Sequence, residues 1–66
     1  MDETKKVHLY VLETQDMFGE RMYYAGDWSD KSEIEKAKRY TLDEAMKEAR
    51  HLREWGLHYR SVRVDN

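Results

Sequence analysis

The sequence predicts an α+β domain in which one amphipathic helix covers one face of a three-stranded, mainly antiparallel sheet, in the order ββαβ. Two observations carry this prediction. Residues 7–12 alternate between apolar and other side chains, as in a strand, and residues 42–52 carry apolar side chains at helical spacing. The chain has 66 residues, which is enough for one thin core, so we expect a single domain over residues 1–66.

The first strand is expected over residues 5–13, with Val7, Leu9 and Val11 on the face toward the helix. Residues 14–19 break the alternation and end in Gly19, which indicates the connection of a β-hairpin. The second strand is expected over residues 20–25, where both faces carry large side chains and can be partly buried.

Residues 26–40 are polar and acidic, and we expect a loop around the single large residue Trp28. Ser32 and Glu35 have the spacing of a capping box, which predicts one helical turn over residues 33–38 that buries Ile34 and Ala37.

Thr41 and Glu44 have the same capping spacing, and here a full helix is expected. Gly56 is suited to end it. The last strand is expected within residues 57–64, where the alternation slips, so that a bulge or a late start near Arg60 is required. The apolar stripe of the helix consists of Leu42, Ala45, Met46, Ala49 and Leu52.

Composition excludes several function classes. The chain has no cysteine, which removes disulfides, thiolate zinc sites and cysteine nucleophiles. Its apolar runs are far shorter than the roughly 20 residues of a membrane-spanning helix. Met1 is followed by acidic residues instead of a signal peptide, so we expect a cytoplasmic protein. No recognisable catalytic, phosphate-binding or metal-binding motif occurs, and we expect neither an enzyme nor a cofactor.

The net charge is only −2, but it is unevenly distributed. Residues 1–35 carry 9 acidic and 4 basic side chains, whereas residues 36–63 carry 8 basic and 4 acidic ones. The molecule is therefore expected to be dipolar, with surfaces that suit either a basic or an acidic partner.

A single helix leaves one sheet face open, and this face is the expected binding surface. We assign partner binding to rings and guanidinium groups expected there: Tyr10, Tyr23, Tyr59, Arg21 and Arg63. His8 and Leu12 are expected on the same face. The alternative is that these tyrosines are ordinary strand residues and that the loop with Trp28 folds over part of the face.

Residues 22–49 carry a motif that resembles small phage and prophage proteins. The motif comprises Tyr23-Tyr24-Ala25-Gly26, Trp28-Ser29, Glu35, Ala37-Lys38-Arg39-Tyr40-Thr41 and Glu44-Ala45. Such proteins are often host-takeover or anti-defence factors, including some anti-CRISPR inhibitors, and they occlude a surface of a host enzyme or complex. They share no functional residue, so the resemblance implies a mode of action without implying a site.

These observations together predict a small non-catalytic binding protein, encoded by a phage or mobile element, that inhibits a host protein or complex by protein–protein contact. Two alternatives stay open. The same open face could bind single-stranded nucleic acid by stacking bases on its rings, or two open faces could pack together in a homodimer.

Overall fold

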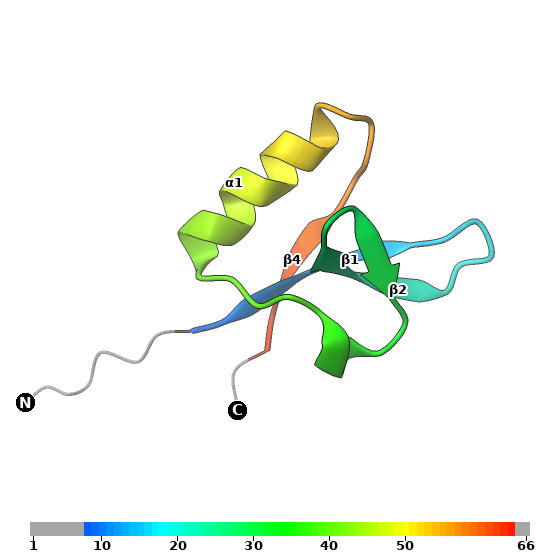
Figure 1. The fold of residues 1–66 in the computed structure, drawn as a ribbon, viewed down its shortest axis with the longest axis horizontal. Coiled ribbons are helices and arrows are strands. Elements are labelled where there is room, and N and C mark those ends of the chain that lie inside the picture. The colour runs from blue at the N-terminus through cyan, green and yellow to red at the C-terminus, as the bar shows by residue number, and fades with distance from the viewer. Residues whose placement is uncertain (1–7, 65–66) are drawn as a thin grey trace, which may run out of the picture.

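The computed structural model of the protein describes residues 8–64, whose strands form one antiparallel sheet in the order β3-β2-β1-β4 (Figure 1). The helix α1 runs along one side of β1 and β4. The predicted α+β class is confirmed. In chain order the elements are β1 (Tyr10–Gln15), β2 (Arg21–Gly26), β3 (Ser29–Lys31), the 3-10 turn η1 (Ile34–Lys36), α1 (Leu42–Arg53) and β4 (Arg60–Arg63).

The β-hairpin predicted at residues 14–19 is confirmed, although β1 extends to Gln15, two residues beyond its predicted end. The side chain of Asp16 orders the turn, because its Oδ1 accepts hydrogen bonds from the N–H groups of Phe18 and Glu20, both at 2.9 Å. The part of the predicted strand that precedes residue 8, including Val7, lies outside the described residues.

The last strand starts at Arg60, so residues 57–59 precede it and need not follow its alternation. The predicted late start is therefore confirmed. Strand β4 pairs with β1 so that Leu12 lies opposite Ser61 and Tyr10 lies opposite Arg63.

Strands β1 and β2 separate toward the start of β1, and the chain segment before α1 fills the gap. Tyr10 and Tyr40 exchange two backbone hydrogen bonds of 2.8 Å, and the N–H of Lys38 donates to the carbonyl of Tyr24 at 3.0 Å. These bonds place the first turn of α1 above β1.

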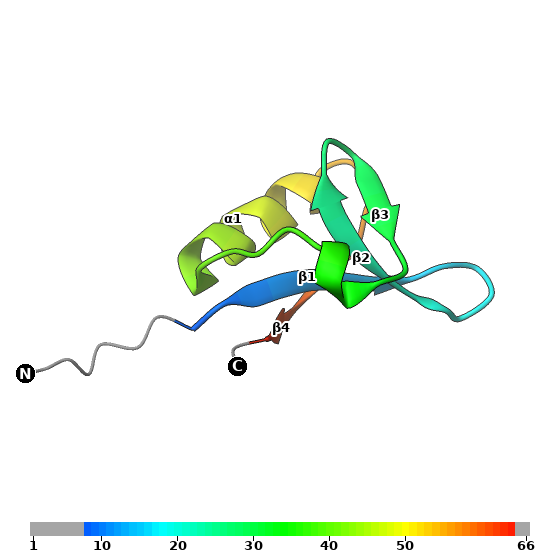
Figure 2. The same cartoon turned by 60° about the horizontal axis from the view of Figure 1, so that its bottom comes forward.

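The prediction of three strands is wrong, because a fourth strand, β3, pairs with β2 inside the predicted loop 26–40 (Figure 2). All three of its residues are exposed. A short edge strand that buries neither face needs no apolar alternation, so the sequence pattern did not reveal it.

The predicted helical turn over residues 33–38 is present as the shorter η1, with Ala37 buried and Ile34 half-buried. The predicted cap is wrong: Glu33, and not Ser32, precedes the turn, and its side chain makes no capping hydrogen bond. In Figure 1 this green turn lies on the opposite side of β1 from α1.

Both ends of α1 are formed as the sequence predicts. Thr41 Oγ1 accepts from the N–H of Glu44, and Glu44 Oε1 accepts from the N–H of Thr41, which completes the capping box. At the other end, the N–H of Leu57 donates to the carbonyl of Leu52 at 3.0 Å. Gly56 adopts a φ of +80°, which makes this hydrogen-bonding pattern possible at little cost.

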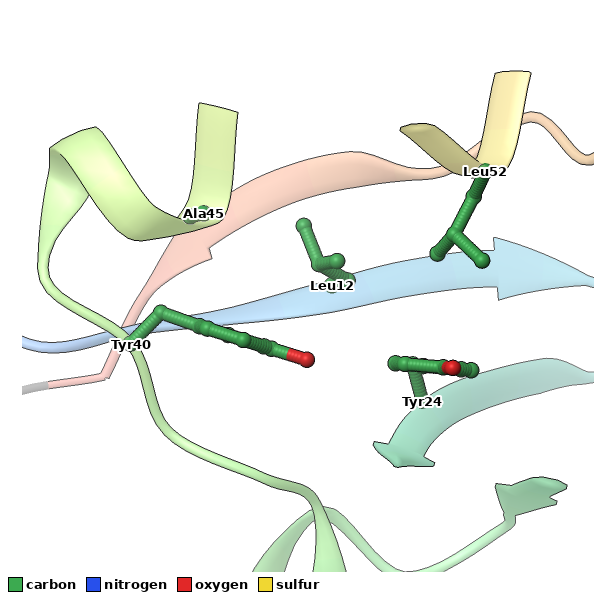
Figure 3. Packing of buried hydrophobic residues seen from close by; sticks show 5 residues of the cluster. All are labelled: Leu12, Tyr24, Tyr40, Ala45 and Leu52. Atoms are coloured by element: carbon green, nitrogen blue, oxygen red, sulfur yellow. The ribbon is translucent and has the colours of Figure 1, made fainter. Parts of the chain in front are cut away.

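The core lies between α1 and the sheet and consists of Leu12, Tyr24, Tyr40, Ala45 and Leu52 (Figure 3). The predicted faces of β1 are therefore reversed, since Leu12 points to the helix and the alternation of a strand turns Val11 away from it. Val11 and Leu12 are both fully buried, so apolar character alone could not distinguish the two faces. The rings of Tyr10 and Tyr59, which the sequence analysis placed on the open face, pack against this helix-side core.

Not all of the helical stripe is covered. Ala45 and Leu52 are buried, whereas Leu42 and Met46 remain about half exposed. Within residues 8–64, no helix is long and apolar enough to cross a membrane.

Candidate protein-interaction site

The five residues predicted to share one binding face are divided between the two faces of the sheet. Tyr10 and Tyr59 pack against the helix-side core. Arg63 is the cross-strand neighbour of Tyr10. Tyr23 lies opposite Glu13 on the far face of the sheet, and Arg21 shares a groove of about 480 Å³ with Tyr59. The prediction that the five residues share one open face is therefore wrong. Their role in binding a protein or single-stranded nucleic acid stays a prediction.

Tyr59 has a structural role that the sequence did not indicate. Its hydroxyl donates a 2.7 Å hydrogen bond to Asp30 Oδ1, and its ring meets Tyr24 edge to face at 5.5 Å. Burial and the bond to Asp30 raise the pKa of this hydroxyl above its ordinary value. Because Asp30 belongs to β3 and Tyr59 directly precedes β4, this bond links opposite edges of a curled sheet.

A strained turn presents Trp28 to solvent. Asp27 and Trp28 are the two central residues of the β2–β3 hairpin, and their φ values are +53° and +59°. Two positive φ angles are typical of a type I′ turn, which favours Asn-Gly. The turn is fixed from the core, because the N–H of Trp28 donates to the buried hydroxyl of Tyr24 at 3.2 Å.

Trp55 approaches from the end of α1. Its N–H donates to the carbonyl of Leu52 at 2.9 Å, so its backbone is tied to one of the most deeply buried residues. Figures 1 and 2 both show the β2–β3 turn beside the connection from α1 to β4. Two segments far apart in sequence thus bring their tryptophans together.

The two indole rings meet edge to face with centroids 5.9 Å apart, and the His51 ring lies 5.9 Å from Trp28. We call Trp28, His51 and Trp55 the aromatic cluster. Trp28 remains 57% exposed and Trp55 66% exposed, and a cleft of about 360 Å³ lies between their side chains. The cluster is thus an accessible apolar surface on a fixed backbone.

Sequence reasoning missed this cluster. It identified Trp28 as a residue that could cover the sheet and as part of the motif in residues 22–49, and it did not single out Trp55. One signal was available: Trp55 directly precedes the helix-ending Gly56, a position at the exposed end of the helix where a large apolar side chain is not needed for the core. Its contact with Trp28 depends on the hairpin formed by the missed strand β3.

The buried charged residue within residues 8–64 is Glu13. Glu13 is buried and pairs through Oε1 with Arg60 Nε at 3.0 Å, so this carboxylate already has a cation partner. Residues 8–64 contain no group of three His, Cys, Asp or Glu side chains that could hold a metal ion.

Comparisons with protein-family models, curated proteins and solved structures gave no match. The candidate site therefore rests on the geometry of the aromatic cluster.

Proposed function

We propose that the protein is a small non-catalytic binding protein that acts by protein–protein contact through its aromatic cluster. The observation that carries the proposal is the exposed pair Trp28 and Trp55, held on two fixed backbone segments. Tryptophan is among the residues most enriched where single side chains dominate binding energy. A rigid pair also loses little conformational entropy when a partner covers it.

The backbone of Trp28 supports a binding role. A side chain at a φ near +60° costs about 1–2 kcal/mol, which a glycine would avoid. The buried part of the indole contributes roughly 2 kcal/mol, about as much as the strain costs, so Trp28 adds little net stability. Strain of this kind is found preferentially at ligand-binding and active sites. We infer that Trp28 contributes to partner recognition more than to folding.

The narrower form of the proposal is inhibition of a host protein or complex by a phage-encoded chain. Its support is the resemblance of residues 22–49 to small phage and prophage proteins, and Trp28 belongs to the motif that carries this resemblance. Occlusion of a host surface requires only a stable contact, and a fixed tryptophan pair is suited to provide one.

The proposal is tested by affinity capture from a bacterial lysate with the wild-type chain, Trp55→Ala and Phe18→Ala. Phe18 is the matched control, because it is also an aromatic residue and is 85% exposed at the tip of the β1–β2 hairpin. We expect a reproducible partner whose retention falls by at least about 30-fold with Trp55→Ala, as at a typical hot spot. Phe18→Ala should retain it.

Two results would contradict the proposal. The first is the absence of any reproducible partner. The second is a partner that Trp55→Ala retains as well as the wild type does, because binding would then use another surface. Circular dichroism of each variant confirms that the fold is unchanged before capture.

A further inference from the structure

A second surface lies between α1 and β4, away from the aromatic cluster. It is a groove of about 430 Å³ whose lining shares no residue with the cleft between Trp28 and Trp55. Figure 1 shows α1 running beside β4, which is an edge strand of the sheet among the described residues. The lining residues are Ala45, Met46, Ala49, Arg50, Arg53, Tyr59, Arg60 and Ser61.

The hydrogen-bond pattern of the sheet determines which backbone groups point into this edge. The N–H of Val64 donates to the carbonyl of Leu9 at 2.8 Å, so Val64 points toward β1. Antiparallel strands alternate in this respect, and Val62 and Arg60 therefore also point toward β1. Ser61 consequently directs its N–H and carbonyl away from β1, toward the side where an added strand would lie.

The charge of the groove is entirely positive. Arg50, Arg53 and Arg60 line it, and no acidic residue does. The guanidinium groups of Arg50 and Arg53 form no ion pair with any residue in 8–64, whereas Arg60 pairs with Glu13 and still keeps 73% of its side chain exposed. Guanidinium groups bind carboxylates through paired hydrogen bonds.

The floor of the groove is apolar. Met46 is half exposed and lies one helical turn from Ala49, so a flexible side chain and a small one form a shallow apolar strip along α1. Such a strip accommodates one or two aliphatic side chains of an extended peptide, since alternate residues of a strand point to the same side.

We infer that this groove binds an extended acidic segment of a partner protein, which adds to β4 as a fifth strand. Its backbone pairs with Ser61, its carboxylates bind Arg50 and Arg53, and an aliphatic side chain packs against Met46. Strand addition at a sheet edge combines affinity from backbone hydrogen bonds with specificity from side-chain pockets. The inference goes beyond the proposed function, because it concerns a separate surface and names the chemistry of the segment bound.

The test is a ¹⁵N NMR titration of the full chain with three end-capped peptides. The first repeats glutamate, threonine, valine and threonine, so that glutamate and valine share the side that faces α1. The second has lysine in place of glutamate, and the third is the glutamate peptide with alternate backbone nitrogens methylated. At about 1 mM peptide, we expect only the first to shift the amide signals of Ala49, Ser61 and Val62. Methylation should weaken binding at least about tenfold, because it removes the backbone donors of one strand edge.

Variants locate the charge effect. Arg50→Ala and Arg53→Ala should each weaken the glutamate peptide about threefold to tenfold, and binding should fall as salt rises. Lys36→Ala removes the same charge from η1 and should leave binding unchanged. Equal binding of the glutamate and lysine peptides, or no shift at the three amides, would overturn the inference.

Two other occupants would also overturn it. If sedimentation shows a dimer and the Ser61 amide becomes protected as the dimer forms, the edge pairs with a second copy of the chain. If an oligothymidylate shifts the same amides more strongly than the glutamate peptide, the arginines bind phosphate. We expect a monomer and a weaker oligonucleotide response.

Discussion

Replacing Trp28 by glycine or by alanine separates the strain of the β2–β3 turn from the contacts of the indole ring. Both substitutions remove the indole ring and its contact with Trp55. Trp28 is 57% exposed, so the apolar area lost is roughly 100 Å², worth roughly 2 kcal/mol. The two variants differ only in what their backbones tolerate at a φ of +59°.

Alanine keeps a Cβ and retains the cost of the left-handed conformation, about 1–2 kcal/mol. Glycine removes this cost but loses about 0.5–1 kcal/mol more backbone entropy on folding. Trp28→Gly should therefore be more stable than Trp28→Ala by about 0.5–1 kcal/mol. For a domain of this size, that difference raises Tm by about 3–6 °C.

The assay is urea unfolding at equilibrium, with thermal unfolding as a second measurement. Lys47→Gly and Lys47→Ala provide the matched control, because Lys47 is exposed within α1 and alanine should there be the more stable of the two by about 1 kcal/mol. Glycine should be the more stable replacement at position 28, whereas alanine should be the more stable replacement at position 47. If Trp28→Ala proves as stable as Trp28→Gly, the turn is not strained and the inference from strain to binding fails.

Three further predictions concern the core and its edges. Tyr59→Phe should lower the free energy of unfolding by about 1 kcal/mol, because it removes the hydrogen bond to Asp30. Tyr40→Phe should lower it by less than about 0.5 kcal/mol, because the buried hydroxyl of Tyr40 has no hydrogen-bond partner within residues 8–64. Equal losses in urea unfolding would refute this contrast. Burial raises the pKa of both tyrosines above the ordinary value of 10.0, so their hydroxyls lose protons in the unfolded chain at lower pH than in the folded protein. The free energy of unfolding should therefore be level below about pH 10 and fall as the pH rises further. Urea unfolding across that range checks this, and a free energy of unfolding that rises there would disprove it. Arg60→Ala should lower the free energy of unfolding by about 1–2 kcal/mol, because it leaves the carboxylate of Glu13 buried without its partner. Adding Glu13→Gln to this variant should recover part of the loss. A double variant that is no more stable than Arg60→Ala alone would argue against this pairing.

The elements with local signals were predictable from the sequence. Local signals located both ends of α1 to within a residue or two. These signals are the capping box of Thr41 and Glu44 and the glycine at position 56, and each depends only on neighbouring backbone groups. The hairpin before Glu20 was predictable for the same reason. The fourth strand had no such signal, because β3 buries nothing and is held only by its pairing with β2.

The face of β1 was not predictable, because Val11 and Leu12 are both fully buried and either could have faced the helix. Leu12 faces the helix because the rings of Tyr24 and Tyr40, which belong to other segments of the chain, pack beside it. The aromatic cluster was not predictable for a related reason: the contact of Trp28 with Trp55 is tertiary, and it depends on the unpredicted hairpin. Side-chain composition predicted that aromatic rings would be exposed, but it did not indicate which rings these would be.

The most direct test of the central claim uses the two tryptophans themselves, since they are the only ones in the chain and both belong to the aromatic cluster. The chain is labelled with 5-fluorotryptophan, and its ¹⁹F spectrum is recorded alone and bound to the unlabelled partner obtained by capture. We predict that both fluorine resonances shift and lose their sensitivity to solvent isotope on binding, because the partner covers both rings. A stable complex in which both resonances keep their positions and their solvent sensitivity would contradict the account.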